Sequence, residues 1–502
     1  MPTRTKALLA DAPLADLSRV GVVDVGSNSV RLVIFDGAAR SPAYFFNEKV
    51  LCGLGAGLGQ SGVLSPEGRV LALSTLARFC DLARRMNVTS LTGVATAAVR
   101  EAKDGPDFVA QVERETGLTL RVVSGQEEAR LAAQGVLVGW PEALGLTVDI
   151  GGASMELARI HGGRIGSCVT SSLAPLALAD LKPKDVDRTI ETTLTDLRDQ
   201  MPGNVETMFL VGGSWRAIAS LHMARTEYPL RVLHAYQIDP ADLAETAEWA
   251  ASRTLDDLSG LTATSDARMA LVPMASRVLV RLLDHFTPGK VLISSYGLRE
   301  GVLYDHMSAD ARRRDPLIEA ARHMELAAAR FPGFGDALFE WILPIFPDLD
   351  EYWLRLVQAA CLLHDVNWRT HPDFRATAGF EAVTRANLGG IGHRGRIFIG
   401  LVLSHRYKSG RRARPDEALL TLLTQEEQVL AEVVGRALRL GSMLTGASAS
   451  CLEDAPLRRK AAVLSLTLKG EMTRMGGAVV EKRLAKLAQA LELEATVEVS
   501  AP

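Results

Sequence analysis

A stretch of sixteen residues occurs twice in this chain of 502 residues, and the repeat constrains the fold more than any other feature. The first copy, VVDVGSNSVRLVIFDG, runs from Val22 to Gly37, and the second, TVDIGGASMELARIHG, runs from Thr147 to Gly162. The constant offset of 125 residues places Asp24 over Asp149. Each copy has a β-branched run ending in Asp, a Gly/Ser/Asn turn and a second apolar run, a pattern that predicts a tight β-hairpin.

The turns of the two hairpins carry the groups that hold phosphate. Glycine lets backbone N–H groups approach an anion closely, small hydroxyls add donors, and an aspartate at a strand end binds Mg²⁺ directly or through water. A single turn of this kind is equally well an ordinary hairpin turn, but its duplication favours a functional reading. A third turn follows the apolar run Met208 to Val211. The predicted metal ligands are Asp24 and Asp149, and the predicted phosphate-binding residues are Gly26, Ser27, Asn28, Ser29, Arg31, Gly151, Gly152, Ser154, Gly212, Gly213 and Ser214.

These turns, within DVGSNSVRLVIFD, DIGGASMEL and VGGS, resemble the phosphate loops of the exopolyphosphatase/guanosine pentaphosphatase (Ppx/GppA) family. The resemblance covers roughly residues 18 to 305 and continues more weakly through the C-terminal third. It implies the actin/Hsp70/sugar-kinase superfold, which is ribonuclease H-like, with two similar α/β lobes and the site in the cleft between them. The expected parts of the chain are a leader (1–17), lobe I (18–131), lobe II (132–307) and a helical C-terminal domain (308–502).

The same resemblance assigns two catalytic residues. Arg100 follows a predicted strand and matches the family's arginine for the phosphate being cleaved, although such an arginine taken alone is usually a surface ion-pair partner. Ser124 and Glu127 have the S-x-x-E spacing of a capping box. Glu128 points about 100° further round the helix. It matches the family's general base, and its alternative is a solvated helix-surface glutamate.

Two positions depart from the family pattern. Ala153 stands where a third glycine is usual, which fits only if its φ is negative. Ser171 and Ser172 begin a segment where a Leu-Gly pair is common, which puts one phosphate contact in doubt. Gly297 to Gly301 resembles the element that closes lobe II, and we interpret it as mainly structural.

The C-terminal region resembles an HD-type phosphohydrolase that has lost its metal site. His364 and Asp365 match the HD pair, and His323 is placed like the first histidine of that family. The closing aspartate is missing, because the corresponding segment reads Leu438 to Ser442. Three ligands without the fourth make a poor metal site, so we expect a degenerate HD-like domain rather than a second active centre.

A basic stretch lies between Ala382 and Pro415, with eight Lys and Arg residues and no acid. A charge run is usually a solvated face, but its length in a chain of net charge −3 favours a track for a polyanion. Nucleic acid is the rival ligand. Only Tyr407 is placed to stack on bases there, so a phosphate-only ligand is favoured. The predicted track residues are Arg406, Lys408, Arg411, Arg412 and Arg414.

The composition is that of a soluble globular protein. The five cysteines are scattered without metal or redox spacing, which favours a reducing compartment. No apolar run approaches the ~20 residues that span a bilayer, and Asp11 and Asp16 interrupt the N-terminal segment where a signal peptide is apolar. We therefore expect a cytoplasmic protein without membrane or nucleic-acid partners.

The leading hypothesis is a Mg²⁺-dependent phosphohydrolase that removes terminal phosphate from inorganic polyphosphate. The first alternative is a guanosine pentaphosphate (pppGpp) 5′-phosphohydrolase, which shares all these motifs. An ATP-dependent kinase and a non-enzymatic phosphate sensor are further alternatives; no acceptor or adenosine pocket is evident for the first, and intact Glu128 and Arg100 argue against the second. The resemblance also implies a homodimer.

Overall fold

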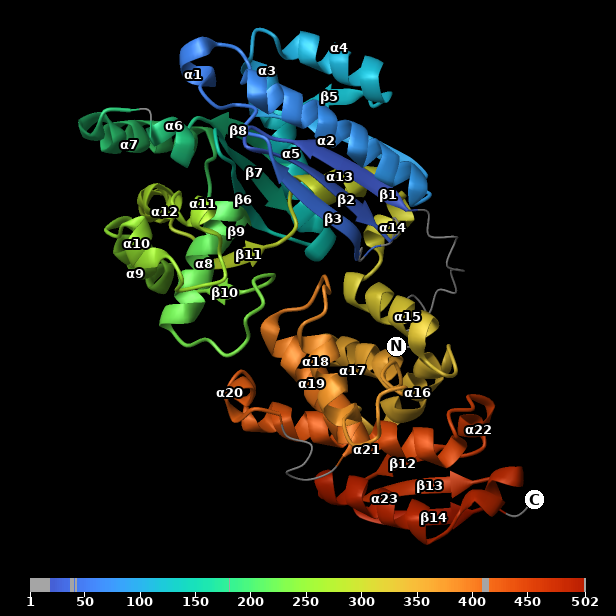
Figure 1. Ribbon diagram of the computed structural model, residues 1–502. Coiled ribbons are helices and arrows are strands. Elements are labelled where there is room, and N and C mark those ends of the chain that lie inside the picture. The colour runs from blue at the N-terminus through green and yellow to red at the C-terminus, as the bar shows by residue number, and fades with distance from the viewer. Residues whose placement is uncertain (1–18, 37–39, 41–42, 180, 409–414, 501–502) are drawn as a thin grey trace. The chain divides into compact units, whose positions relative to one another are not determined.

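The computed structural model describes residues 19–36, 40, 43–179, 181–408 and 415–500. The expected leader, residues 1–17, lies outside them. The chain forms two compact units, one of residues 1–224 and 237–314, the other of residues 225–236 and 315–502 (Figure 1). In the described part of the chain, every helix is too short or too polar to cross a lipid bilayer.

The first unit contains two mixed β-sheets built on the same plan. One has the strand order β3-β2-β1-β4-β5, and the other, read in the same direction, has the order β8-β7-β6-β9-β11-β10. In each, an antiparallel hairpin pairs in parallel with the next strand of the sheet. The strands are β1 Val20–Val25, β2 Ser29–Phe35, β3 Tyr44–Leu51, β4 Ser90–Ala95, β5 Leu120–Val122, β6 Gly145–Ile150, β7 Met155–His161, β8 Arg164–Ser171, β9 Thr207–Gly212, β10 Gln237–Ile238 and β11 Lys290–Ser294.

The repeated sequence forms the corresponding hairpin of each sheet, as predicted. Gly26 donates its N–H to the carbonyl of Ser29 at 3.0 Å, and Gly151 donates to Ser154 at 2.9 Å. The two turns therefore close in the same way. Residues that lie 125 positions apart in the two copies therefore occupy equivalent places in the two hairpins.

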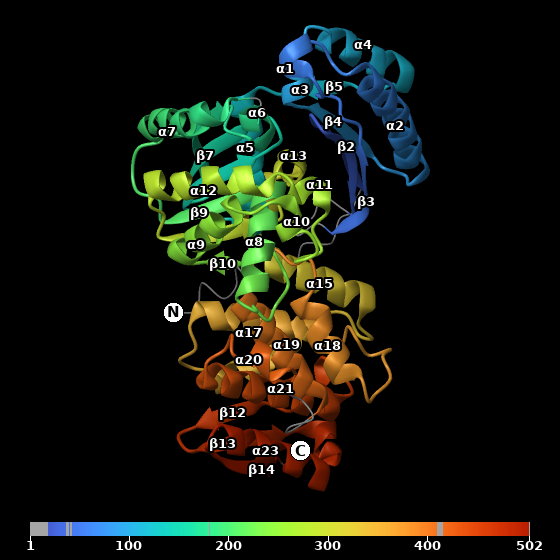
Figure 2. The same ribbon diagram turned by 60° about the vertical axis from the view of Figure 1, so that its left-hand side comes forward.

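Helices cover both faces of the first sheet. Apolar residues of α2 and α4 pack against one face, including Phe79 and Phe108, which are fully buried (Figure 2). Ser65 caps α2 by accepting the N–H of Gly68. The helices of the first unit are α1 Leu58–Ser61, α2 Pro66–Arg85, α3 Ala97–Glu101, α4 Gly105–Thr116, α5 Gly125–Gly139, α6 Pro175–Ala179, α7 Pro183–Gln200, α8 Gly213–Arg225, α9 Pro240–Ala251, α10 Leu255–Leu258, α11 Asp266–Met269, α12 Val272–Phe286, α13 Leu298–His306 and α14 Ala309–Arg313.

Helix α5 packs against both sheets. Leu131 and Val138 contact residues of the first sheet, while Ala133 and Val136 contact residues of the second. Every residue from Leu131 to Gly139 is buried, as expected of a helix that is covered on all sides along this part of its length. The N-terminus of α5, which carries Glu128, is thereby held between the two sheets.

Two glycines bring α13 into backbone contact with α5. A Cβ at Gly135 would lie 2.2 Å from the carbonyl oxygen of Gly297, and one at Gly301 would lie 1.8 Å from that of Leu131. No side chain fits at either position. This close approach fixes Gly297–Gly301 beside the middle of α5, so the segment is structural, as predicted, but it also places Arg299 beside Asp24.

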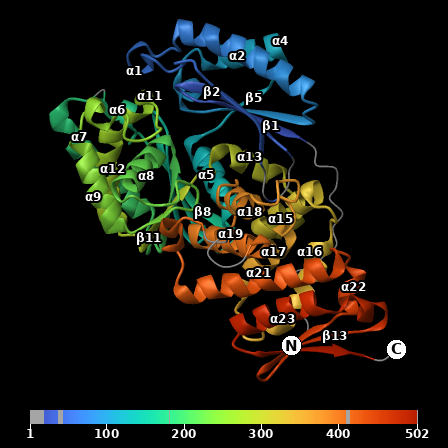
Figure 3. The same cartoon turned by 60° about the horizontal axis from the view of Figure 1, so that its bottom comes forward.

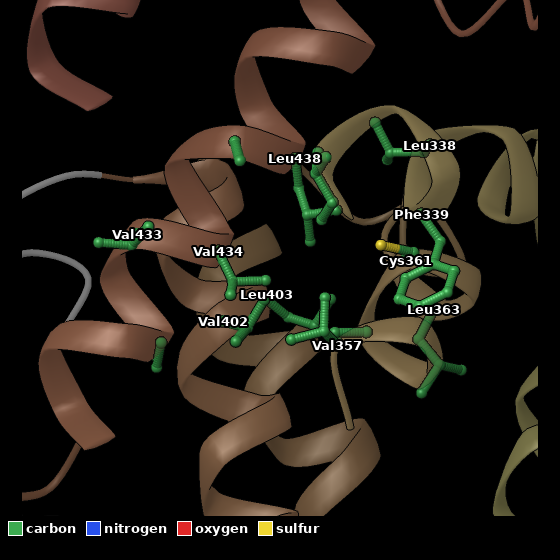
Figure 4. Close-up of a cluster of buried hydrophobic side chains, with 14 of the residues drawn as sticks. Leu338, Phe339, Val357, Cys361, Leu363, Val402, Leu403, Val433, Val434 and Leu438 are labelled. Carbon is green, nitrogen blue, oxygen red and sulfur yellow. The ribbon is translucent and has the colours of Figure 1, made fainter. Parts of the chain in front are cut away.

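The second unit is mainly helical, as expected, and has one large apolar core. Figure 4 shows side chains of α16, α17, α19 and α21 converging, among them Leu338, Val357, Val402 and Leu438. The helices are α15 Pro316–Ala328, α16 Phe334–Ile342, α17 Glu351–Leu363, α18 Arg375–Thr384, α19 His393–Tyr407, α20 Glu417–Leu420, α21 Gln425–Thr445, α22 Ser450–Glu453 and α23 Ala478–Ala490, with 3-10 turns at Leu343–Ile345 and Gly470–Met475.

A three-stranded sheet ends the second unit, which the helical interpretation of the C-terminal third did not include. Its strands are β12 Leu457–Lys460, β13 Val463–Leu468 and β14 Glu494–Val499, and α23 packs against it (Figure 3). In β13 the buried residues Leu464, Leu466 and Leu468 alternate with less buried ones. That period of two is typical of a half-buried strand.

Candidate active site

A groove of about 880 Å³ joins the two hairpin turns within the first unit. The residues that line it come from both turns, the loop after β3, the start of α5 and the end of β8. They are Ser27, Asn28, Gly53, Gly55, Ala56, Leu58, Gly59, Gly62, Ala98, Arg100, Glu101, Gly125, Ala153, Ser154, Thr170, Ser171, Ser172, Leu176 and Ala177. The serines that replace the usual Leu-Gly pair therefore lie in the groove.

The loop after β3 is bound to the first turn through the backbone. The carbonyl of Asn28 accepts the N–H groups of Cys52 and Gly53, each at 3.1 Å, and the carbonyl of Ser27 accepts that of Gly55 at 2.8 Å. The carbonyls of Ser27 and Asn28 are therefore occupied, and both residues line the groove.

Ala153 in the second turn has a negative φ, since it is not among the non-glycine residues with positive φ. An alanine fits at this position because it needs a negative φ there, as stated above. The backbone of the second turn needs no glycine there.

Asp149, at the end of β6, contacts the third turn. A Cβ at Gly212, whose φ is +110°, would lie 2.9 Å from Asp149 Oδ1 and 2.5 Å from the carbonyl of Ile150. Only glycine can adopt this positive φ and also lie this close to the Asp149 side chain and the Ile150 backbone. Loss of solvent raises the pKa of Asp149 to about 6, against the lowering effect of Arg216 and Arg299. The ionised form of the Asp149 carboxylate is therefore destabilised by burial, although two arginines lie nearby.

Glu128 and Arg100 form an ion pair. Arg100 Nη1 lies 3.2 Å from Glu128 Oε2 and also donates to the carbonyl of Val123 at 3.0 Å. Burial and the neighbouring Asp149 raise the pKa of Glu128 to about 7, although Arg100 lowers it. The side chain of Glu128 is 13% exposed, which excludes a freely solvated helix-surface glutamate.

Glu127 differs from its expected role. Ser124 caps α5 by accepting the N–H of Glu127, as predicted. The Glu127 carboxylate, however, pairs with Arg121 and Arg130 at 3.5 Å instead of closing a capping box. The two arginines offer a charged partner, which a backbone N–H does not outcompete.

Glu156 is a site residue that the sequence reasoning did not single out. It accepts the hydroxyl of Thr170 at 3.0 Å, and burial together with Glu128 raises its pKa well above the usual range. The repeat contains the signal that was missed, because Asp24 pairs with Arg31 in β1–β2 while Asp149 pairs with Glu156 in β6–β7. The two copies therefore have a basic residue and an acidic residue at the same position.

Five cations gather beside Asp24 and Asp149, and we call them the basic wall: Arg31, Lys49, Arg216, Arg268 and Arg299. Arg299 Nη1 lies 3.1 Å from Asp24 Oδ2. Burial, followed by Arg299 and Arg268, lowers the pKa of Arg216 to about 10. Burial also lowers the pKa of Lys49, followed by the effects of Arg268 and Arg31. Cations that repel one another in this way are stabilised by an anion between them.

The predicted phosphate-binding residues lie at the ends of three strands in one unit. Arg31, on β2, belongs to the basic wall and donates to Asn47 at 2.8 Å. Gly213 packs against the Arg268 guanidinium, since a Cβ there would lie 2.9 Å from Arg268 Nε. Ser214 is buried in the first turn of α8. Lys49, Arg216 and Arg268 carry no motif, so only the fold brings them to the site.

The predicted basic track is wrong for Arg406, which is only 5% exposed and lies inside the second unit. Lys408 is half-buried and donates to the carbonyl of Asp373. Arg411, Arg412 and Arg414 lie outside the described residues. Arg396 is also buried and donates to the carbonyls of Ala386 and Leu388, at 2.7 and 2.8 Å. The basic stretch therefore contains structural arginines as well as surface ones.

Comparison with known proteins agrees with this geometry. Residues 33–310, more than half of the chain, match the sequence model of the Ppx/GppA phosphatase family. The chain belongs to the Ppx/GppA phosphatase family. Residues 317–496 match the exopolyphosphatase C-terminal family.

Two kinds of relative support this membership. Exopolyphosphatase 1 of Mycobacterium tuberculosis and that of Mycobacterium leprae are each 34% identical over 143 residues, which is 28% of this chain and 42% of the relative. The match thus spans less than half the length of these curated relatives. Solved structures of the Ppx/GppA member of Aquifex aeolicus (TM-score 0.51, 23% identity) and of an exopolyphosphatase of Cytophaga hutchinsonii (TM-score 0.52, 22% identity) each cover 58% of this chain and 97% of their own, and they show the two-lobed fold.

Proposed function

We propose that the protein is a Mg²⁺-dependent exopolyphosphatase, which hydrolyses the terminal phosphate of inorganic polyphosphate. The observation that carries the proposal is the pairing of Glu128 with Arg100 beside a groove that both hairpin turns line. One residue is suited to take a proton and the other to bind the phosphoryl group. Arg100 lines the groove, and Glu128 is paired with it.

The carboxylates of the site fit a hard divalent cation. In the described residues, no three His, Cys, Asp or Glu side chains gather closely enough to enclose a metal ion. Mg²⁺, however, commonly takes one or two carboxylates and completes its shell with water and substrate phosphate. Asp149, with its raised pKa and with Asp24 nearby, is a carboxylate that a cation would stabilise. When bound, Mg²⁺ neutralises charge on the phosphate oxygens.

The protein's own groups then perform three tasks. Backbone N–H groups of the turns and the Arg100 guanidinium hold the terminal phosphoryl group in position. Glu128 accepts a proton from a water molecule, for which a pKa of about 7 is well placed near neutral pH. Phosphoryl transfer needs mainly positioning and charge neutralisation. No covalent nucleophile is required.

The basic wall supports a substrate with several phosphates in a row. Arg100 lines the groove, whereas Arg216, Arg268 and Lys49 are not among the described residues that line it. A chain whose terminal phosphate is bound by Arg100 and whose further phosphates are bound by the basic wall would contact both groups of cations. The match of residues 317–496 to the exopolyphosphatase C-terminal family also favours polyphosphate.

A pppGpp 5′-phosphohydrolase is the second candidate, because its triphosphate end would meet the same groups. The deciding experiment measures phosphate release from long polyphosphate, pppGpp and ATP side by side, with and without Mg²⁺, using Glu128→Gln as the inactive control. We expect the highest kcat/KM on polyphosphate. A higher value on pppGpp would assign the second candidate, and Mg²⁺-independent release would refute the mechanism.

Two further expectations accompany the proposal. A cytoplasmic location follows from the sequence composition, and a homodimer follows from the family resemblance. Sedimentation of the full-length protein measures the second directly.

A further inference from the structure

A salt bridge occupies Asp24, one of the two predicted metal ligands. Arg299 Nη1 lies 3.1 Å from Asp24 Oδ2, and the side chains of Arg299 and Asp24 are 16% and 21% exposed. A cation can therefore reach the pair from solvent. A guanidinium and a metal ion compete for the same lone pairs of a carboxylate. Asp24 is thus paired with a positive group that belongs to the protein itself.

The first turn of α13 also holds Arg299 beside the second predicted ligand. Glu300, which is fully buried, accepts the Tyr44 hydroxyl and the N–H of Gly297, each at 2.8 Å. These two bonds hold the turn in place. Gly297 borders Asp149, because a Cβ added to Gly297 would lie 3.8 Å from Asp149 Oδ2. Arg299 therefore extends from a turn that borders one carboxylate, and it binds the other.

The Arg299 guanidinium has a donor that the ion pair leaves unused. Its Nε is buried and has no hydrogen-bond partner in the described part of the chain. Burial lowers the pKa of Arg299, but Glu300 and Asp24 raise it above the usual value, so the side chain stays charged. Other cations of the basic wall lie nearby, and burial followed by Arg299 lowers the pKa of Arg268. A charged arginine with an unpaired buried donor and further cations beside it is suited to an oxyanion.

We propose that Arg299 substitutes for the metal ion at Asp24, and that Arg299 exchanges Asp24 for a phosphate of the substrate when the cation binds. The inference rests on the proposed function, from which it takes both the cation and the polyanion. Asp24 has one positive partner at a time, and Arg299 has one negative partner at a time. In the absence of metal, the ion pair keeps the carboxylate paired and keeps the guanidinium from binding phosphate unproductively.

The exchange couples the binding of the cation to the binding of the anion. A cation at Asp24 releases Arg299 for phosphate, and a phosphate at Arg299 releases Asp24 for the cation. Such coupling is reciprocal, so each ligand should raise the affinity for the other by the same factor. In the free protein the ion pair thus opposes both ligands. A salt bridge that merely holds α13 in place would support the binding of both.

The first test measures Mn²⁺ binding to the full-length protein in phosphate-free buffer, by electron paramagnetic resonance of the free ion. Mn²⁺ is a cation that carboxylates also bind. Arg299→Gln should tighten Mn²⁺ binding by roughly tenfold, because a charge-assisted hydrogen bond no longer competes for Asp24. Arg299→Lys keeps the charge but lacks the guanidinium fork, so it should change Mn²⁺ binding in the same direction.

Arg31→Gln is the matched control. Arg31 stands opposite Asp24 in the β1–β2 pair, but it donates to Asn47 at 2.8 Å. Its removal takes away a neighbouring positive charge while the Asp24 ion pair stays, so Arg31→Gln should tighten Mn²⁺ binding much less than Arg299→Gln does. Equal tightening by these two variants, or no tightening by Arg299→Lys, would overturn the exchange. Arg299→Lys also decides the matter if Arg299→Gln does not fold.

The second test measures tripolyphosphate binding by calorimetry in EDTA, where no metal takes part. Asp24→Asn should tighten this binding by roughly tenfold, because it frees Arg299 for the anion. In the Arg299→Gln background the same substitution should give a much smaller gain. An equal gain in both backgrounds, or no gain in either, would refute the exchange. Neither test depends on hydrolysis, so a protein that proves inactive on polyphosphate would refute the proposed function, while the binding measurements would still decide this inference.

Discussion

Replacing Glu128 with glutamine removes proton acceptance from the site while leaving its size and its hydrogen bond from Arg100 intact. The wild-type side chain has a pKa raised from 4.5 to about 7, so it is a stronger base than an ordinary glutamate and is still half ionised near neutral pH. Losing a general base typically costs 10²–10⁴ in rate, so we expect kcat to fall by about that factor. Because one negative charge next to Asp149 is also lost, the KM for a polyanion should stay the same or decrease.

The assay is phosphate release from polyphosphate at saturating Mg²⁺ and at a pH above the pKa of Glu128. Glu127→Gln is the control, because Glu127 is 32% exposed and makes only long ion pairs at 3.5 Å. It should change the free energy of unfolding by no more than ~1 kcal/mol and leave kcat unchanged. An unchanged kcat with a raised KM in Glu128→Gln, or an exchange of the two phenotypes, would show that Glu128 binds substrate instead of accepting a proton.

Four further outcomes are expected. In the pH–rate profile, kcat should rise with pH through about 7 as Glu128 loses its proton, and Arg100→Gln, which removes a cation that lowers this pKa, should move the rise to higher pH. Asp149→Asn should increase the Mg²⁺ concentration needed for half-maximal activity, since it removes a charge from a hard-cation site, and activity that survives excess EDTA would contradict this. Arg268→Gln should raise KM and weaken its salt dependence more on long polyphosphate than on pppGpp; equal effects would count against an extended wall. Gly301→Ala should lower the melting temperature, because its Cβ meets the Leu131 carbonyl at 1.8 Å and overpacking costs ~1–3 kcal/mol, whereas Gly166→Ala, with its nearest neighbour at 3.6 Å, should not.

The sequence predicted those parts of the site that repeat or follow a local pattern. The two hairpins, the cap at Ser124 and the direction of Glu128 all depend on spacing within a few residues, whereas the predicted third turn is a direct junction of β9 with α8 at Gly212 and Gly213. Arg216, Arg268 and Lys49 lie far apart in the chain and carry no spacing signal, so they become recognisable only when helices α8 and α11 and strand β3 bring them together. Charge alone was misleading for Arg406, because a linear run of basic residues does not reveal which of them turn into a core.

The fold of the second unit was also only partly predictable from the sequence. Its helices follow from apolar periodicity, but β13 alternates for only six residues, which is too short to stand out within a helix-rich region. The twin sheets of the first unit were inferred from the family resemblance. The repeat itself fixed only the paired hairpins, because the crossover strands between them have no repeated sequence.

The segment 225–236 belongs to the second unit although it lies within the sequence of the first. Tyr228 bonds His393 Nδ1 at 2.9 Å, and Tyr236 stacks on the same imidazole at 5.6 Å. The chain therefore crosses between the units three times, after residues 224, 236 and 314. A gene fragment that begins at residue 315 would lack a piece of its own core, and one that stops at 314 would retain that piece without its packing partners. A single proteolytic cut at residue 314 should leave the two fragments associated, because the segment 225–236 of the first fragment packs within the second unit.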